Sequence, residues 1–153
     1  LKQFSGNKLF RKAKLIDDGA LENVINSSRS EWTYKYKKEN FNGLSFDDAI
    51  KIPKKNMNDL YNLLNEHSIK LSIAVYPWPG TLKNDTVDNL QVKIWKDFCK
   101  SKCKKFYNFM PIFFTELKKE NFVKTYMNFY ISGDIHFNTK GNKAIADHFL
   151  LKY

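Results

Sequence analysis

The chain has 153 residues, which is enough for one domain with an ordinary core. Because 42% of the residues are hydrophobic and 16% aromatic, the chain is too apolar for a disordered protein, and no apolar run approaches the roughly 18 residues that cross a bilayer. The formal net charge of +10 favours anionic partners. The lysines are scattered along the chain, so we interpret this charge as a solvated surface and expect no nucleic-acid site.

Residues 1–52 form a helical or irregular lead-in segment. ALENVINSS (20–28) is predicted to be helical, because its apolar residues recur at helical spacing. In the next stretch Trp32, Tyr34 and Tyr36 alternate with polar or basic residues, so an extended chain would place the rings on one side. Such rings beside lysines can bind an acidic polymer. The alternative is a surface connection whose rings pack on the body of the protein.

Residues 53–153 show an alternation that is typical of an α/β portion. The predicted elements are a helix after Pro53, a buried strand in 69–77, a helix capped near Asp85 or Thr86, a strand in 105–111, mostly helical residues 112–131 and a terminal helix after residue 138. This order implies parallel strands covered by helices. Two or three strands are fewer than such sheets usually have. We therefore expect that an amino-terminal part is missing.

The two cysteines, Cys99 and Cys103, lie four residues apart and share a face if they are helical. At a helix end they can form a disulfide if the chain is exported. Free, buried thiols are the alternative. A zinc site needs about four ligands, and no second cysteine pair exists. We therefore expect no metal ion and no cofactor.

Two loops are candidates for a site, because ligands of open α/β sheets bind beyond the carboxyl ends of the strands. YPWPG (76–80) leaves the first predicted strand, and its prolines stiffen the loop that displays Trp78. Trp78 is a candidate substrate-binding residue, and a hydrophobic lid on the sheet edge is the alternative. The second loop, DIHFN (134–138), precedes the last helix. If the sheet is parallel, both loops lie at the same edge.

Asp134 and His136 are the candidate catalytic residues. In an extended turn, side chains at i and i+2 point the same way, so the carboxylate can reach the imidazole Nδ1–H. That contact fixes the tautomer and leaves Nε2 free to take a proton from a nucleophile. The alternative is a turn in which Asp134 only bonds backbone amides. Three neighbours have predicted structural roles: Gly133 allows the backbone angle at the turn, Asn138 caps the last helix, and Gly141 lets the first turn of that helix approach the sheet closely.

The block GDIHFNTKGNKAIAD (133–147) resembles the last motif block of the SGNH/GDSL-type hydrolases, where an Asp and a His stand just before the carboxy-terminal helix. Its Asp-x-His form, followed by an aromatic residue, an Asn and a later Gly, is similar to the branch that contains the alginate-acetylating proteins. KLSIAVYPWPG, QVKIWKDFC and KFYNFMP also resemble the carboxy-terminal half of bacterial proteins of this family. The resemblance covers about residues 55–153.

This resemblance implies a partial three-layer α/β/α fold of the flavodoxin-like kind, with a parallel sheet. It also implies a catalytic triad with a serine nucleophile, acting on small-molecule or carbohydrate esters. The family's Gly-Asp-Ser nucleophile block is absent, and Ser5 has too few residues ahead of it for a preceding strand. We therefore expect the carboxy-terminal part of a serine esterase or O-acyltransferase, which carries Asp134 and His136 but is inactive alone.

In this interpretation an upstream part of the same protein supplies the nucleophile. The cysteine pair and the family resemblance favour an exported, periplasmic or membrane-anchored full-length protein. Two alternatives stay open. One is a non-catalytic, basic α/β module that binds an acidic polymer, and the other is an inactive relative of the hydrolases.

Overall fold

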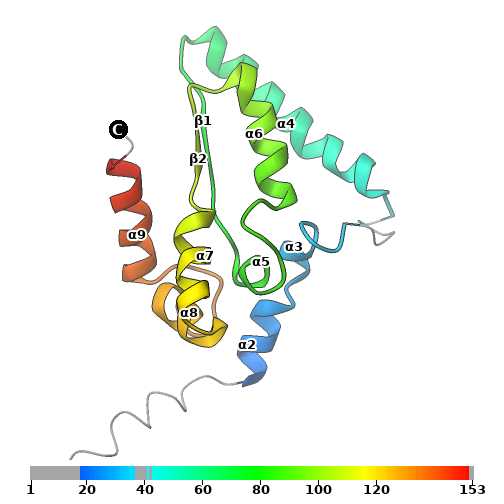
Figure 1. Ribbon diagram of the computed structural model, residues 1–153. Coiled ribbons are helices and arrows are strands. Elements are labelled where there is room, and N and C mark those ends of the chain that lie inside the picture. The colour runs from blue at the N-terminus through cyan, green and yellow to red at the C-terminus, as the bar shows by residue number, and fades with distance from the viewer. Residues whose placement is uncertain (1–17, 37–40, 42, 152–153) are drawn as a thin grey trace, which may run out of the picture.

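The computed structural model describes residues 18–36, 41 and 43–151, and these residues form a mixed α/β structure (Figure 1). The described elements, in chain order, are α2 (Asp18–Ile25), α3 (Ser28–Glu31), α4 (Phe46–Glu66), β1 (Ser72–Val75), α5 (Pro79–Asn84), α6 (Leu90–Lys102), β2 (Lys105–Asn108), α7 (Met110–Lys119), α8 (Phe122–Phe129) and α9 (Thr139–Leu150).

β1 and β2 form a two-stranded parallel sheet, in which Ser72 pairs with Lys105 and Val75 with Asn108. Parallel strands need a crossover connection, which α5 and α6 provide here. Helix α6 packs against both strands, while α9 brings the ring of Phe149 to 5.1 Å from that of Tyr107. Figure 1 shows the sheet between α6 and α9. The predicted parallel strands with covering helices are therefore confirmed, as far as a two-stranded sheet can show them.

The core is densest beyond the carboxyl end of the sheet. The fully buried side chains there come from β1, α5, α7 and α8 and the residues that flank them: Val75, Leu82, Met110, Phe113, Tyr126 and Tyr130. The ring of Phe113 lies 5.0 Å from those of Phe129 and Phe137. Helices α7 and α8 and the chain before α9 therefore share one aromatic cluster. This cluster supports the loop that precedes α9.

Helix α4 begins earlier than predicted. The helix expected after Pro53 starts at Phe46, because the hydroxyl of Ser45 accepts the N–H of Asp48 at 3.1 Å and caps the helix. Residues 52 and 53, where the sequence suggested a division, therefore lie in one continuous helix. None of its residues is buried, and Leu63 is 53% exposed.

Two further helix boundaries differ from the prediction. The helix expected to be capped near Asp85 or Thr86 begins at Leu90, where the side chain of Asn89 accepts the N–H of Val92 at 3.1 Å. The helical stretch 112–131 is divided into α7 and α8, because Asn121 caps a new helix by accepting the N–H of Lys124. Both predicted strands are confirmed, with four residues each.

The predicted helix in 20–28 is confirmed by α2. Of the two interpretations of the aromatic stretch that follows, the structure shows the surface connection, because the chain there forms turns and is not extended. Trp32, Tyr34 and Tyr36 lie in and around the turns that follow α3. The hydroxyl of Tyr34 accepts a hydrogen bond from Asn84 at 3.4 Å, and the ring of Tyr36 lies 5.7 Å from that of Phe46. These two rings thus pack on the body of the protein. Residues 37–40 of this stretch, like Ser5, lie outside the described residues.

The cysteine pair forms a disulfide at the end of α6. Cys99 lies in the last turn of the helix and Cys103 is its C-cap residue, with 4.5 Å between their Cα atoms. Of the two alternatives that the sequence left open, the structure therefore contains the disulfide.

Candidate functional site

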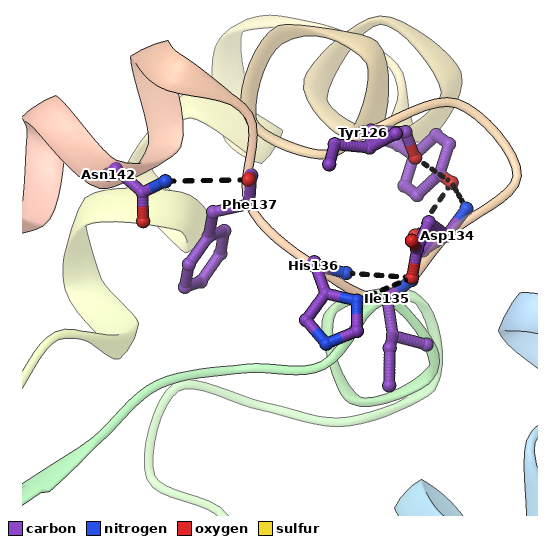
Figure 2. Close-up of polar contacts among 7 residues, drawn as sticks. Tyr126, Asp134, Ile135, His136, Phe137 and Asn142 are labelled. Carbon is purple, nitrogen blue, oxygen red and sulfur yellow. Dashed lines mark hydrogen bonds and ion pairs between the residues drawn. The ribbon is translucent and has the colours of Figure 1, made fainter.

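The two loops singled out from the sequence meet at the carboxyl edge of the sheet. Residues 134–138 are called the Asp–His loop below. The hydroxyl of Tyr130, which precedes this loop, donates a hydrogen bond to the carbonyl of Pro77 at 2.8 Å. The rings of Tyr76 and Phe137 lie 5.3 Å apart. In Figure 2 the His136 ring points toward the green ribbon that follows β1. The prediction that both loops share one edge is confirmed.

Asp134 and His136 contact each other directly (Figure 2). Oδ1 of Asp134 lies 2.7 Å from Nδ1 of His136, and the same oxygen accepts the backbone N–H groups of Ile135 at 2.6 Å and of His136 at 3.3 Å. The side-chain hydrogen bond to His136 is the main cause that lowers the pKa of Asp134, and the backbone N–H groups act in the same direction. Asp134 therefore contacts the imidazole and the backbone amides, which the sequence presented as alternatives.

This geometry selects one form of the neutral imidazole. An ionised carboxylate only accepts hydrogen bonds, so Nδ1 carries the proton and Nε2 keeps its lone pair. No group among the described residues hydrogen-bonds to Nε2. The side chain of His136 is 74% exposed and that of Asp134 43% exposed. A contact this exposed contributes little stability, so its defined geometry must come from the loop that carries it.

Tyr126 of α8 supports that loop from the inside. The single proton of its hydroxyl is shared between two acceptors, the carbonyls of Ile131 at 2.7 Å and Asp134 at 2.9 Å, and its oxygen accepts the N–H of Asp134 at 2.9 Å (Figure 2). The residue is completely buried, and burial raises the pKa of Tyr126, so the hydroxyl keeps its proton. The sequence placed Tyr126 only on the apolar stripe of a helix and did not identify its contact with the candidate site.

The predicted roles of Gly133 and Asn138 are confirmed, whereas Gly141 allows a close approach of α9 to the end of α8 and not, as predicted, to the sheet. Gly133 has a φ of +74°, which side chains other than glycine rarely adopt. Asn138 caps α9 by accepting the N–H groups of Lys140 at 2.9 Å and Gly141 at 3.1 Å. A Cβ atom at Gly141 would lie 2.2 Å from the carbonyl oxygen of Phe129. Together they fix where α9 begins relative to α8.

Trp78 is the N-cap residue of α5 and is half-buried. Its loop lies beside the Asp–His loop through the hydrogen bond from Tyr130 to Pro77. Among the described residues, the Trp78 side chain makes no hydrogen bond with Asp134 or His136. Its role in substrate binding stays a prediction.

No group of three or more His, Cys, Asp or Glu side chains within residues 18–36, 41 and 43–151 could hold a metal ion. In the same part of the chain, every helix is too short or too polar to cross a membrane.

Comparisons of this chain with protein-family models, with curated proteins and with solved structures found no match.

Proposed function

We propose that this chain is the carboxy-terminal part of an SGNH-like serine esterase or O-acyltransferase, in which His136 is the general base and Asp134 its orienting acid. The observation that carries the proposal is the 2.7 Å contact between Asp134 Oδ1 and His136 Nδ1, on a loop at the carboxyl edge of a parallel sheet. Nε2 then accepts the proton of a nucleophilic hydroxyl, and the carboxylate stabilises the imidazolium that forms.

The proton transfers follow from this arrangement. The hydroxyl attacks an ester carbonyl while its proton moves to Nε2 of His136, and the imidazolium then gives that proton to the leaving alcohol. Water or a second hydroxyl, such as that of a sugar, accepts the acyl group in the next step. Asp134 stays ionised throughout, because the hydrogen bond from His136 lowers its pKa.

The proposal requires a nucleophile that the described residues do not bring to His136. No Ser or Thr hydroxyl in that part of the chain hydrogen-bonds to Nε2. The exposure of the imidazole likewise requires a further segment that covers one side of the site. We assign both to an upstream part of the same protein.

The test uses the full-length protein that contains this chain. A fluorophosphonate probe, which reacts with activated serines, should label the wild type, and His136→Ala should reduce hydrolysis of p-nitrophenyl acetate by about 10³-fold or more. His67→Ala is the matched control, since His67 is an exposed histidine at the C-cap of α4, and it should retain full activity. Wild-type rates in the His136→Ala protein would end the assignment.

A groove between α4 and α6 favours a second candidate function, a basic module that binds an acidic polymer. The groove, of about 560 Å³, is lined by Lys54 of α4 and by a row of lysines on α6, Lys93, Lys96 and Lys100. These three lie at i, i+3 and i+7, so they share one helical face. The single acid of the lining, Asp97, is paired with Lys100 at 2.7 Å. The lining therefore carries a net positive charge.

Binding to dextran sulfate and to poly-L-glutamate at increasing salt tests this second candidate. Replacement of the three α6 lysines by glutamine should weaken binding. The slope of log K against log salt should then correspond to about three fewer neutralised charges. The control replaces Lys119, Lys124 and Lys143, which lie outside the groove and pair with acids of their own helices or caps. Equal loss of binding in both triple variants would show only a general effect of net charge.

A further inference from the structure

The Asp134–His136 pair lies on a turn that a single buried hydroxyl supports. The N–H of Asp134 bonds the carbonyl of Ile131 at 3.0 Å, Gly133 takes the positive φ of the turn, and the N–H of Ile131 returns to the carbonyl of His136 at 3.0 Å. Tyr126 inserts its hydroxyl into this turn, as Figure 2 shows. We infer that Tyr126 is a positioning residue that sets the orientation of Asp134 toward His136.

Two of the three hydrogen-bond contacts of the hydroxyl are with Asp134, and the third, at 2.7 Å, is with the carbonyl of Ile131. The hydroxyl bonds the N–H of Asp134 and the carbonyl of the same residue, each at 2.9 Å. Because both peptide groups that flank the Cα atom of Asp134 are held, the direction of the Cα–Cβ bond is fixed as well. The carboxylate is thereby presented to Nδ1 of His136, although both side chains are largely in solvent. For the proposed reaction this means that Tyr126 acts through Asp134 and never touches the substrate.

The hydroxyl can hold this position because the ring that carries it is itself fixed. Tyr126 is completely buried and stacks on Tyr130, with ring centroids 5.4 Å apart, and on Phe122 at 6.1 Å. Groups that must be held within a fraction of an ångström depend on such packed supports.

Removal of the hydroxyl should leave a folded protein. In Tyr126→Phe the ring packing remains, and the N–H of Asp134 keeps the carbonyl of Ile131 as its acceptor. Only the carbonyl of Asp134 loses its one hydrogen bond among the described residues. Tyr130→Phe is a matched control, because Tyr130 is equally buried and its hydroxyl bonds the other loop, at Pro77.

The experiment measures the tautomer of His136 in the chain by two-bond ¹H–¹⁵N correlation spectra, together with amide exchange at Asp134. In Tyr126→Phe we expect the Nδ1–H form of His136 to lose population, the pKa of Asp134 to rise and its amide to exchange at least about 10-fold faster. Tyr130→Phe should leave all three unchanged. A folded Tyr126→Phe with a wild-type His136 spectrum overturns the inference.

If Tyr126→Phe does not fold, the measurement is repeated in sucrose, which favours the compact state. A variant that stays unfolded there, while Tyr130→Phe folds, would assign the hydroxyl to stability and also overturn the inference.

In the full-length protein, Tyr126→Phe should lower kcat by about 10- to 100-fold with little change in KM. The catalytic role of Tyr126 rests on the proposed function. The spectra do not depend on ester chemistry, so they can establish that Tyr126 positions Asp134 even if the proposed function is wrong.

Discussion

Helix α4 and the segment from Tyr126 to Gly141 are held by different kinds of interaction. All 21 residues of α4 are at least partly exposed, and its cap and ion pairs, such as Lys55 with Asp59, connect residues of its own sequence. The second segment joins the end of α8 to the start of α9, and it contains completely buried side chains and a hydrogen bond from Tyr130 to the distant Pro77. The longest helix therefore has mainly local interactions, besides the packing of Met57 on the core and of Phe46 on Tyr36, while the second segment has mainly tertiary ones.

This difference matters for function, because a packed support can hold a local contact between two short side chains in a defined geometry on the protein surface. The Asp134–His136 contact lies in the segment that has such a support. The basic groove, in contrast, takes one of its walls from α4, and its lysines are long and flexible. The Asp134–His136 pair thus has a defined geometry, whereas the lysines of the groove can contact an anion in many conformations.

The largest effect should come from the aromatic cluster below the Asp–His loop. Phe113→Ala removes a completely buried ring that contacts Phe129 and Phe137, so we expect a loss of about 3–5 kcal/mol in the free energy of unfolding. Leu63→Ala on α4 removes a side chain that is 53% exposed and should cost about 0.5 kcal/mol or less. Urea denaturation monitored by circular dichroism measures both values. Similar costs for the two variants would contradict the contrast between the segments.

A smaller effect is expected at the caps. Asn138→Ala removes the cap of α9 and the bond from its amide to the carbonyl of Tyr130, so we expect a loss of about 2 kcal/mol in global stability. Ser45→Ala removes the cap of α4 and should cost about 1 kcal/mol, confined to that helix. Native-state amide exchange distinguishes the two, because only Asn138→Ala should accelerate exchange in every element. Uniform acceleration by Ser45→Ala would show that α4 is coupled to the core.

The smallest effect is expected from two exposed carboxylates, one in each segment. The pKa of Asp134 is lowered mainly by His136, and that of Asp48 by Lys51 and Ser45. A folded-state pKa below the unfolded value gives stability that is fully present above the unfolded pKa, near 4, and is lost as the pH falls through the folded value. His136→Ala should therefore raise the pKa of Asp134, reduce stability slightly above pH 4, and leave Asp48 unchanged. Carboxyl ¹³C titration measures both groups, and an unshifted Asp134 in the variant would mean that the histidine is not its main partner.

Local patterns in the sequence were enough to predict several parts of the structure. Alternation of apolar runs predicted both strands and their parallel order, and the i, i+2 spacing predicted the Asp134–His136 contact. Asn138 as a cap and Gly141 as a close-packing position followed from residue type and position relative to a helix. The cap and the Asp134–His136 contact depend on neighbours within a few residues, whereas the parallel pairing of Ser72 with Lys105 follows from the alternation of whole elements.

Most features that the sequence did not predict depend on how neighbouring elements pack against each other. The helical spacing predicts that Tyr126 points inward. The partner of its hydroxyl, however, depends on the path of the chain after α8, which brings Asp134 back to Tyr126. The early start of α4 is an exception, because Ser45 and Asp48 form a local start signal. Pro53 favours a helix that begins after it, but in the structure it occupies the eighth position of α4.

The most direct measurement of the central claim is the tautomer of His136 in the wild type and in Asp134→Asn, read from two-bond ¹H–¹⁵N spectra, with His67 as an internal reference. The carboxylate should hold the Nδ1–H form in the wild type, and the amide, which can donate to Nδ1, should shift the population to the Nε2–H form. A His136 spectrum that is identical in both proteins and matches that of His67 would show that Asp134 does not orient the ring.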